Sequence, residues 1–328
     1  MGARLEGVWA RAALLWLLAS ISLALQGWVG DATIYGKQIE EQRAVLHQAI
    51  LDNHPPGGRT WAEWGALSVQ KRVGVVYLAE AVREATGLRI GAVYKLIDTV
   101  FLMLSLVALF AYLRRWASST MALVGVLYFS AVLPLTYFFQ LFHPWDRLQL
   151  FLWIVLLGLI ADRRFGLLAV GLVLSVIVKF DTVLLPALYF ATHLRREGRQ
   201  RLVVESLILA GLVVGTSMVL GRLFGDPAEA SRFALSGVLE QLGSNWAKLK
   251  SMALGYPPLL VHALPLVLAL FGWRGQPRFV AMSLLFALAM SLIHLLLTNY
   301  EEVRAHMMVL VLALPAALVT VQRLLSRS

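Results

Sequence analysis

The segment SVIVKFDTVLLP, residues 175–186, places a lysine and an aspartate close together inside an otherwise apolar run. An ammonium group can bind an anion such as phosphate, and a carboxylate can accept a proton. Charged groups at bilayer depth are costly unless they are paired, hydrated or close to an interface. Lys179 and Asp181 are therefore candidate functional residues, and the simplest alternative is a structural ion pair between them.

Further polar groups stand near the ends of apolar segments. Lys95 and Asp98, in AVYKLIDTVF, share one face of a helix, where they most simply neutralise each other. Arg304 lies one helical turn from Glu301, so it either binds an anion or forms a local ion pair. The other polar candidates are Asp31, Tyr35, His143, Asp146 and Glu302.

The composition predicts an all-α membrane protein. The 328 residues are 59% hydrophobic and 15% charged, with a mean hydropathy of +0.73. Soluble domains average roughly 45–50% apolar and about 25% charged residues. Recurring apolar runs of about 20 residues are typical of helices that cross a membrane. There is no cysteine, which excludes disulfides and thiolate metal sites.

The net charge of +10 does not indicate a nucleic-acid partner. Most arginines lie in short clusters between apolar runs, where the positive-inside rule expects them on the cytoplasmic side. A nucleic-acid-binding protein needs a basic face on a soluble domain, and the sequence offers none. The predicted apolar segments are 8–28, 90–113, 119–140, 147–161, 166–193, 203–222, 257–273, 279–298 and 305–322.

The arginine clusters at both ends of the segment 166–193 predict that it is a hairpin. It begins after Arg164 and ends before Arg195, so both of its ends belong on the cytoplasmic side. We predict a rising limb, a tip at KFD and a short returning limb; the alternative is one long tilted helix. With a retained first helix, the chain is then a single transmembrane domain, 1–328, of about ten membrane helices with both termini inside.

This topology places the substantial polar loops on the outside. The first loop, 29–89, contains two amphipathic stretches, 34–51 and 73–87, the second of which ends on a glycine suited to a helix C-cap. A second loop, 223–256, contains a third amphipathic stretch. The cytoplasmic connections are short and basic, so we expect the functional site at the outer face.

Three motifs carry a resemblance to a known family. GDATIY (30–35) follows the first helix, KFDT (179–182) forms the hairpin tip, and EEVR (301–304) precedes the last helix. The chain resembles the GT-C-type integral membrane glycosyltransferases, which take sugars from polyprenyl-phosphate carriers at the non-cytoplasmic face. The family often has Lys-Glu-Thr where this chain has KFDT, and an acidic residue where this chain has Ala32.

The resemblance implies a role for each motif. By that resemblance Asp31 becomes the catalytic base. Lys179 and Arg304 are candidate contacts for the phosphate that leaves, because both are expected to reach the outer cavity from separate helices. The expected partners are a polyprenyl-phosphate-linked sugar, membrane lipids and a glycan, lipid or protein acceptor, in a bacterial-type inner membrane. The remaining candidate substrate-binding residues are Tyr35, Asp181, Glu301, Glu302, His143, Asp146, Lys95 and Asp98.

We expect no cofactor and no metal. His262, His294 and His306 stand near predicted outer helix ends and could bind a metal together with acids, but hydrogen-bonded histidines are the simpler interpretation. Two other functions stay open from the sequence: a transporter or lipid-handling scaffold without covalent chemistry, and a noncatalytic relative of the glycosyltransferases. A transporter would more often show internal repeats, and none is visible.

Overall fold

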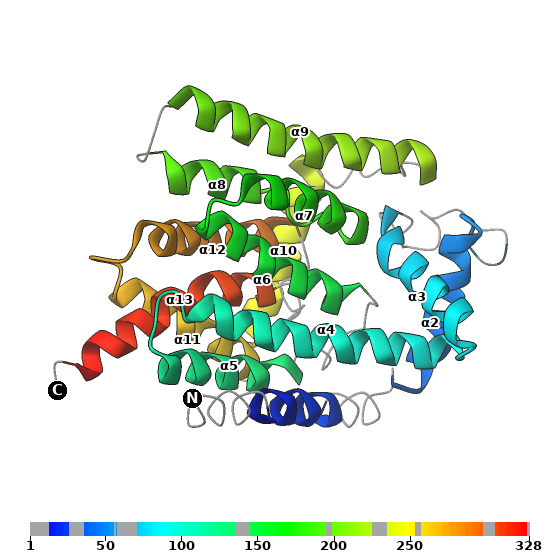
Figure 1. The fold of residues 1–328 in the computed structure, drawn as a ribbon, viewed down its shortest axis with the longest axis horizontal. Helices are drawn as coiled ribbons and strands as arrows, with labels where there is room; N and C mark the ends of the chain where they lie inside the picture. Colours follow the sequence, from blue (N-terminus) through cyan, green and yellow to red (C-terminus); the bar gives the residue numbers. More distant parts are fainter. Residues whose placement is uncertain are drawn as a thin grey trace, which may run out of the picture.

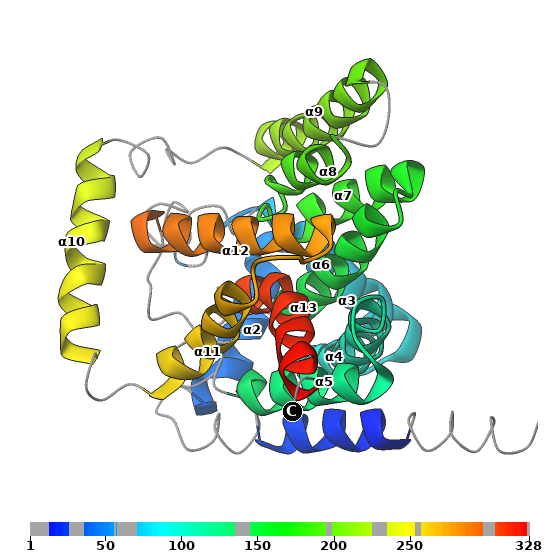
Figure 2. The same ribbon diagram turned by 90° about the vertical axis from the view of Figure 1, so that its left-hand side faces the viewer.

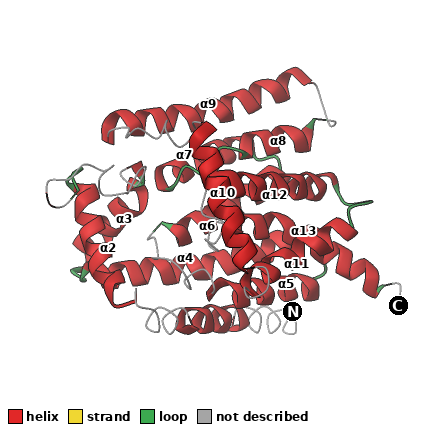
Figure 3. Cartoon of the chain, turned by 180° about the vertical axis from the view of Figure 1, so that it is seen from behind, coloured by secondary structure: helices red, strands yellow, loops and turns green. Residues whose placement is uncertain are grey.

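The computed structural model describes residues 13–25, 36–55, 57, 71–134, 145–194, 199–224, 235–252, 257–297 and 306–326. Within these ranges the regular structure is helical and there is no strand (Figure 3). The described helices are Ala13–Leu25, α2 (Gly36–Leu51), α3 (Val73–Thr86), α4 (Ile90–Leu113), α5 (Ser119–Val132), α6 (Asp146–Ala161), α7 (Phe165–Val178), α8 (Leu185–His193), α9 (Arg199–Phe224), α10 (Leu235–Met252), α11 (Pro257–Phe271), α12 (Arg278–Leu297) and α13 (His306–Leu325). The prediction of an all-helical protein is confirmed.

Four of these helices, α4, α9, α12 and α13, are long and apolar enough to cross a membrane. Helix α9 leaves large apolar side chains uncovered along its length; Leu207 is 67% exposed and Leu223 is 65% exposed. It lies along the edge of the bundle in Figure 1. An apolar surface of this kind is stable in lipid and unfavourable in water, which agrees with the predicted membrane character.

The bundle has two chemically different ends. At one end Arg115, after α4, pairs with Asp162, after α6, with 2.7 Å between Nη2 and Oδ2. Arg278, at the start of α12, donates to the Ala191 carbonyl of α8 at the same end. We call this the arginine end. The opposite end, where α6 begins and α7 stops, is called the tip end; α2 and α3 lie there (Figure 1).

The segment 165–193 reverses direction at the tip end. Helix α7 stops at Val178 and α8 begins at Leu185, with Pro186 in its first turn. The start of α7 follows α6 at the arginine end, and His193, at the end of α8, bonds the Ile160 carbonyl over 2.8 Å. Both ends of the segment therefore lie at the arginine end, as the charge pattern predicted, and one continuous tilted helix is wrong.

Helix α8 has nine residues, so it extends only about 14 Å at 1.5 Å per residue. This length is short of the roughly 30 Å hydrocarbon core. The tip is therefore a break within the bundle rather than a loop far above it.

The three amphipathic stretches form α2, α3 and α10. Gly87 ends α3 in the left-handed conformation, with φ of 68°, and its N–H donates to the Arg83 carbonyl over 2.8 Å. A glycine adopts this conformation without the steric cost that a Cβ brings. Helix α10 packs on α12 and stands at the edge of the molecule in Figure 2.

Candidate functional site

The tip is a stretch of non-helical backbone. Lys179 is extended, with φ of −166° and ψ of 130°, and its N–H still donates to the Ser175 carbonyl of α7. Asp181 follows in a turn, and Thr182 is completely buried. Ending α7 here turns the Lys179 and Asp181 side chains toward α6, where a continuous helix would have spread them over different faces.

Two residues of α6 hold the tip in place. The Gln149 amide donates to the Lys179 carbonyl over 3.1 Å and to the Asp181 carboxylate. The Trp153 indole N–H, one turn further along α6, donates to the same Asp181 oxygen over 2.8 Å. Gln149 is fully buried and Trp153 is 1% exposed, so these bonds form away from solvent, where they constrain the tip most strongly.

Sequence reasoning missed both of these α6 residues. The signal was present: after Asp146 and Arg147, Gln149 is the one strongly polar residue in the apolar remainder of the helix, and Trp153 lies one turn away on the same face. A buried amide must find partners. The sequence could not show that those partners are the very residues of the KFD motif.

The Lys179 ammonium lies between two carboxylates. Its Nζ is 3.5 Å from Asp146 Oδ1 of α6 and 3.5 Å from Asp181 Oδ2. The ion pair of Lys179 with Asp181, which was the alternative to an anion-binding role, is therefore present, and Asp146 joins it. All three side chains keep about a fifth or less of their surface exposed, so the cluster is accessible but mostly enclosed.

Two histidines in mutual contact lie at the same end of the bundle as Lys179. His294 near the end of α12 and His306 at the start of α13 are both buried, and their rings meet edge to face with 5.4 Å between centroids. Lys179 is close enough for its charge to act on His294. Four elements, α6, the tip, α12 and α13, thus bring titratable side chains to one place at the tip end.

Asp98 has a different partner from the one predicted. Its carboxylate is 3.1 Å from the Arg43 guanidinium of α2, and both side chains are buried. The predicted neutralisation by Lys95 is wrong, because Lys95 lies on the exposed side of α4 while Asp98 faces α2. Arg147 of α6 also acts electrostatically on Asp98, which connects this pair to the neighbouring Asp146.

The predicted candidates now fall into three groups. Lys179, Asp181 and Asp146 form one cluster, and Asp98 lies beside it through Arg147. Lys95 faces outward on α4. Asp31, Tyr35, His143, Glu301, Glu302 and Arg304 lie outside the described residues.

Among the described residues, the cluster and the neighbouring Arg43, Asp98 and Arg147 contain equal numbers of cations and carboxylates. The three cations Arg43, Arg147 and Lys179 are matched by three carboxylates, Asp98, Asp146 and Asp181. Asp181 already accepts hydrogen bonds from α6 and contacts Lys179, so it is suited to position the ammonium rather than to accept a proton. Lys179 has three N–H donors and two carboxylate neighbours, which leaves a donor for an anionic ligand.

Within the described ranges, no group of three or more acidic or histidine side chains could hold a metal ion. The comparisons with known proteins add no further constraint: no family, no curated protein and no solved structure matches the chain.

Proposed function

We propose that the chain is a membrane glycosyltransferase that moves a sugar from a polyprenyl-phosphate carrier to a glycan, lipid or protein acceptor. One observation carries the proposal: a lysine ammonium is held between two carboxylates at a break in a membrane helix bundle. A cation fixed in a mostly enclosed site stabilises the charge of a leaving phosphate better than a mobile surface lysine does.

The proposed reaction needs one base and one cation. Asp31 takes the proton from an acceptor hydroxyl, the hydroxyl oxygen bonds to the anomeric carbon, and the bond to the phosphate oxygen breaks. The electron pair leaves with the polyprenyl phosphate, whose charge Lys179 stabilises. No second acid is required, because a phosphate departs without protonation. Inversion at the anomeric carbon follows from a single displacement.

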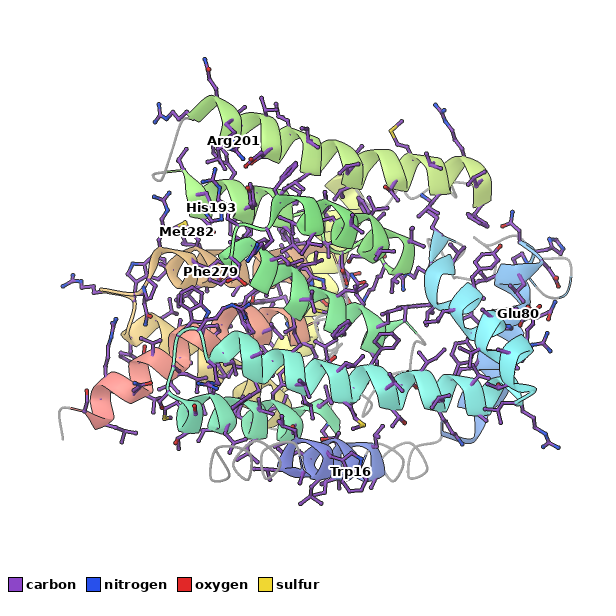
Figure 4. All side chains as sticks on the ribbon, in the orientation of Figure 1. Trp16, Glu80, His193, Arg201, Phe279 and Met282 are labelled. Carbon is purple, nitrogen blue, oxygen red and sulfur yellow. The ribbon has the colours of Figure 1, made fainter. Side chains whose placement is uncertain are left out.

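The proposed orientation places the tip end on the outer side of a bacterial-type inner membrane, with about ten crossings and both termini cytoplasmic. The arginines of the arginine end support it, since cytoplasmic ends of membrane helices are rich in arginine. Figure 4 places His193 and Arg201 together near this end of the bundle and Glu80 near the other.

A single cysteine at Phe180 tests the orientation. The chain has no native cysteine, and Phe180 is 47% exposed beside Lys179. We expect a membrane-impermeant thiol reagent to label Phe180→Cys in intact spheroplasts. A cysteine at Gln200, in the first turn of α9, is the matched control and should stay unlabelled until the membrane is opened. The reverse pattern would place the tip end in the cytoplasm and refute the outer-face site.

The Asp31→Asn substitution tests the reaction. The change keeps the size of the side chain and removes the proton acceptor, so we expect one polyprenyl-phosphate sugar to accumulate and one envelope glycan to disappear, as in cells without the gene. Mass spectrometry of lipid-linked sugars and glycans measures both. Asp52→Asn, at the exposed end of α2, is the control and should match the wild type.

Unchanged lipids and glycans in the Asp31→Asn strain, with the protein inserted normally, would overturn the enzyme proposal. The cluster at the tip end would then serve transport or lipid handling without covalent chemistry.

A further inference from the structure

A second polar cluster, separate from Lys179, joins α2 to α3 and α4. His47 of α2 lies between Glu80 of α3 and Tyr94 of α4: its Nε2 is 3.0 Å from Glu80 Oε2, and its Nδ1 is 2.8 Å from the Tyr94 hydroxyl. His47 is 5% exposed and Tyr94 is fully buried. One titratable ring therefore connects all three helices.

The hydrogen bonds define which ring nitrogen carries the proton when His47 is neutral. An ionised Glu80 can only accept, so Nε2 donates to it. The lone pair then lies on Nδ1 and accepts the hydrogen of the Tyr94 hydroxyl. Both ring nitrogens of His47 therefore have a hydrogen-bond partner of the correct kind, which is the stable arrangement for buried groups.

A second proton on His47 disrupts this arrangement. Nδ1 then also donates, so the Tyr94 hydroxyl must turn its hydrogen away from the ring. The imidazolium also carries a charge in a buried position, which costs free energy. Glu80 offsets part of this cost through its charge, while Arg83 opposes protonation.

We propose that His47 is a pH-sensitive latch, which docks α2 on α3 and α4 at neutral pH and releases α2 in mild acid. Among the described side chains of α2, His47 and Arg43 make the polar contacts with these helices, Ala49 and Ile50 are buried, and Leu46 and Leu51 pack partly buried against the core. The latch does not depend on the proposed glycosyl transfer.

The pKa shifts of His47 and Glu80 both favour release of α2 in acid rather than in base. Burial lowers the pKa of His47 below 6.5, and this effect exceeds the opposing one of Glu80. Hydrogen bonds from Arg83 and His47 lower the pKa of Glu80 to about 2, so its carboxylate stays ionised in mild acid. Since the folded pKa of His47 is below the unfolded value, the docked state is favoured above pH 6.5 and loses stability as pH falls through the lower pKa.

The other charged groups that face His47 from α2, α3 and α4 are tied into ion pairs of their own. Arg43 lies one turn away on α2 and faces Asp98 of α4. Arg83 and Glu84 of α3 interact with each other, and Arg83 also binds Glu80. Asp98, the partner of Arg43, is a second buried titratable group of this interface, and the His47→Gln variant below separates its contribution from that of His47.

Thiol labelling of the full-length protein in detergent micelles tests the latch. Cysteine replaces Ala49, which is 4% exposed on α2, or Val45, which is 44% exposed on the same helix and corrects for the pH dependence of the thiolate. We expect the ratio of labelling rates, position 49 over position 45, to rise several-fold between pH 7.5 and 5.0. The largest possible rise in this ratio is about tenfold for each unit by which burial lowers the pKa of His47.

Two variants separate titration from simple loss of packing. His47→Gln keeps a donor and an acceptor but cannot titrate, so its ratio should change with pH much less than the wild-type ratio does; the response that remains belongs to other groups such as Asp98. Glu80→Gln removes the charge that favours imidazolium, so the pH midpoint of release should move lower. A wild-type ratio that does not change with pH overturns the proposal. So does an equal pH response in His47→Gln, or a midpoint in Glu80→Gln that moves higher.

Discussion

Replacing Lys179 with methionine is expected to reduce the proposed sugar transfer by about 100-fold or more, because it removes the cation that would stabilise the leaving phosphate in that reaction. Methionine fills a similar volume, so the tip should keep its bonds from Gln149 and Trp153. Lys179→Arg keeps the charge but changes its geometry beside Asp146 and Asp181, and it should retain part of the activity. Accumulation of the lipid-linked sugar, measured by mass spectrometry, reports each effect.

Lys250→Met is the control for this prediction. Lys250 is exposed on α10, where its ammonium lies 5.7 Å from the centre of the Trp246 ring. It has no part in the cluster at the tip end, so its loss should leave lipid-linked sugars at the wild-type level. Wild-type glycans in a normally inserted Lys179→Met protein would show that Lys179 is a structural charge and not a phosphate contact.

Arg43→Met is expected to lower the free energy of unfolding by about 3 kcal/mol, because it leaves the Asp98 carboxylate buried without its hydrogen-bonded partner. The expected loss is at the lower end of the range for buried pairs, since Arg147 still acts on Asp98. The double variant Arg43→Met with Asp98→Leu removes both charges and should recover most of the loss. Denaturant unfolding in micelles, followed by circular dichroism, measures these differences.

Arg115→Met provides the matched control at the arginine end. Arg115 and Asp162 form a shorter ion pair than Arg43 and Asp98, but about a third or more of each side chain is exposed. Exposed pairs contribute about 0–1 kcal/mol, so this variant should unfold nearly as the wild type does. An equal loss in Arg43→Met and Arg115→Met would mean that burial of Asp98 has no energetic consequence.

The helices could be predicted closely from the sequence, and the contacts between them could not. Apolar runs and amphipathic spacing located α4, α10 and the other helices to within a few residues, since these patterns are local. The reversal at KFD was also predictable, because arginine clusters bound both ends of the segment. Each of these features depends on residues close in the chain.

The partners of the charged residues depend on packing. Asp98 has Lys95 three positions away but pairs with Arg43, 55 positions away, because the orientation of α4 buries one side chain and exposes the other. Gln149 has no acidic residue within one turn on either side except Asp146, yet it bonds Asp181, 32 positions later. Helical periodicity predicts on which face of a helix such a residue lies. Which residue packs against that face depends on the tertiary structure.

The bonds from Gln149 to the tip also constrain the order of events during biosynthesis. Helix α6 leaves the ribosome first, and its buried amide has to wait for a segment made 32 residues later before it acquires its acceptors. A helix of nine residues such as α8 is too short for stable insertion by itself. We therefore expect α6, α7 and α8 to enter the membrane as one unit, with Gln149 shielded until the tip arrives.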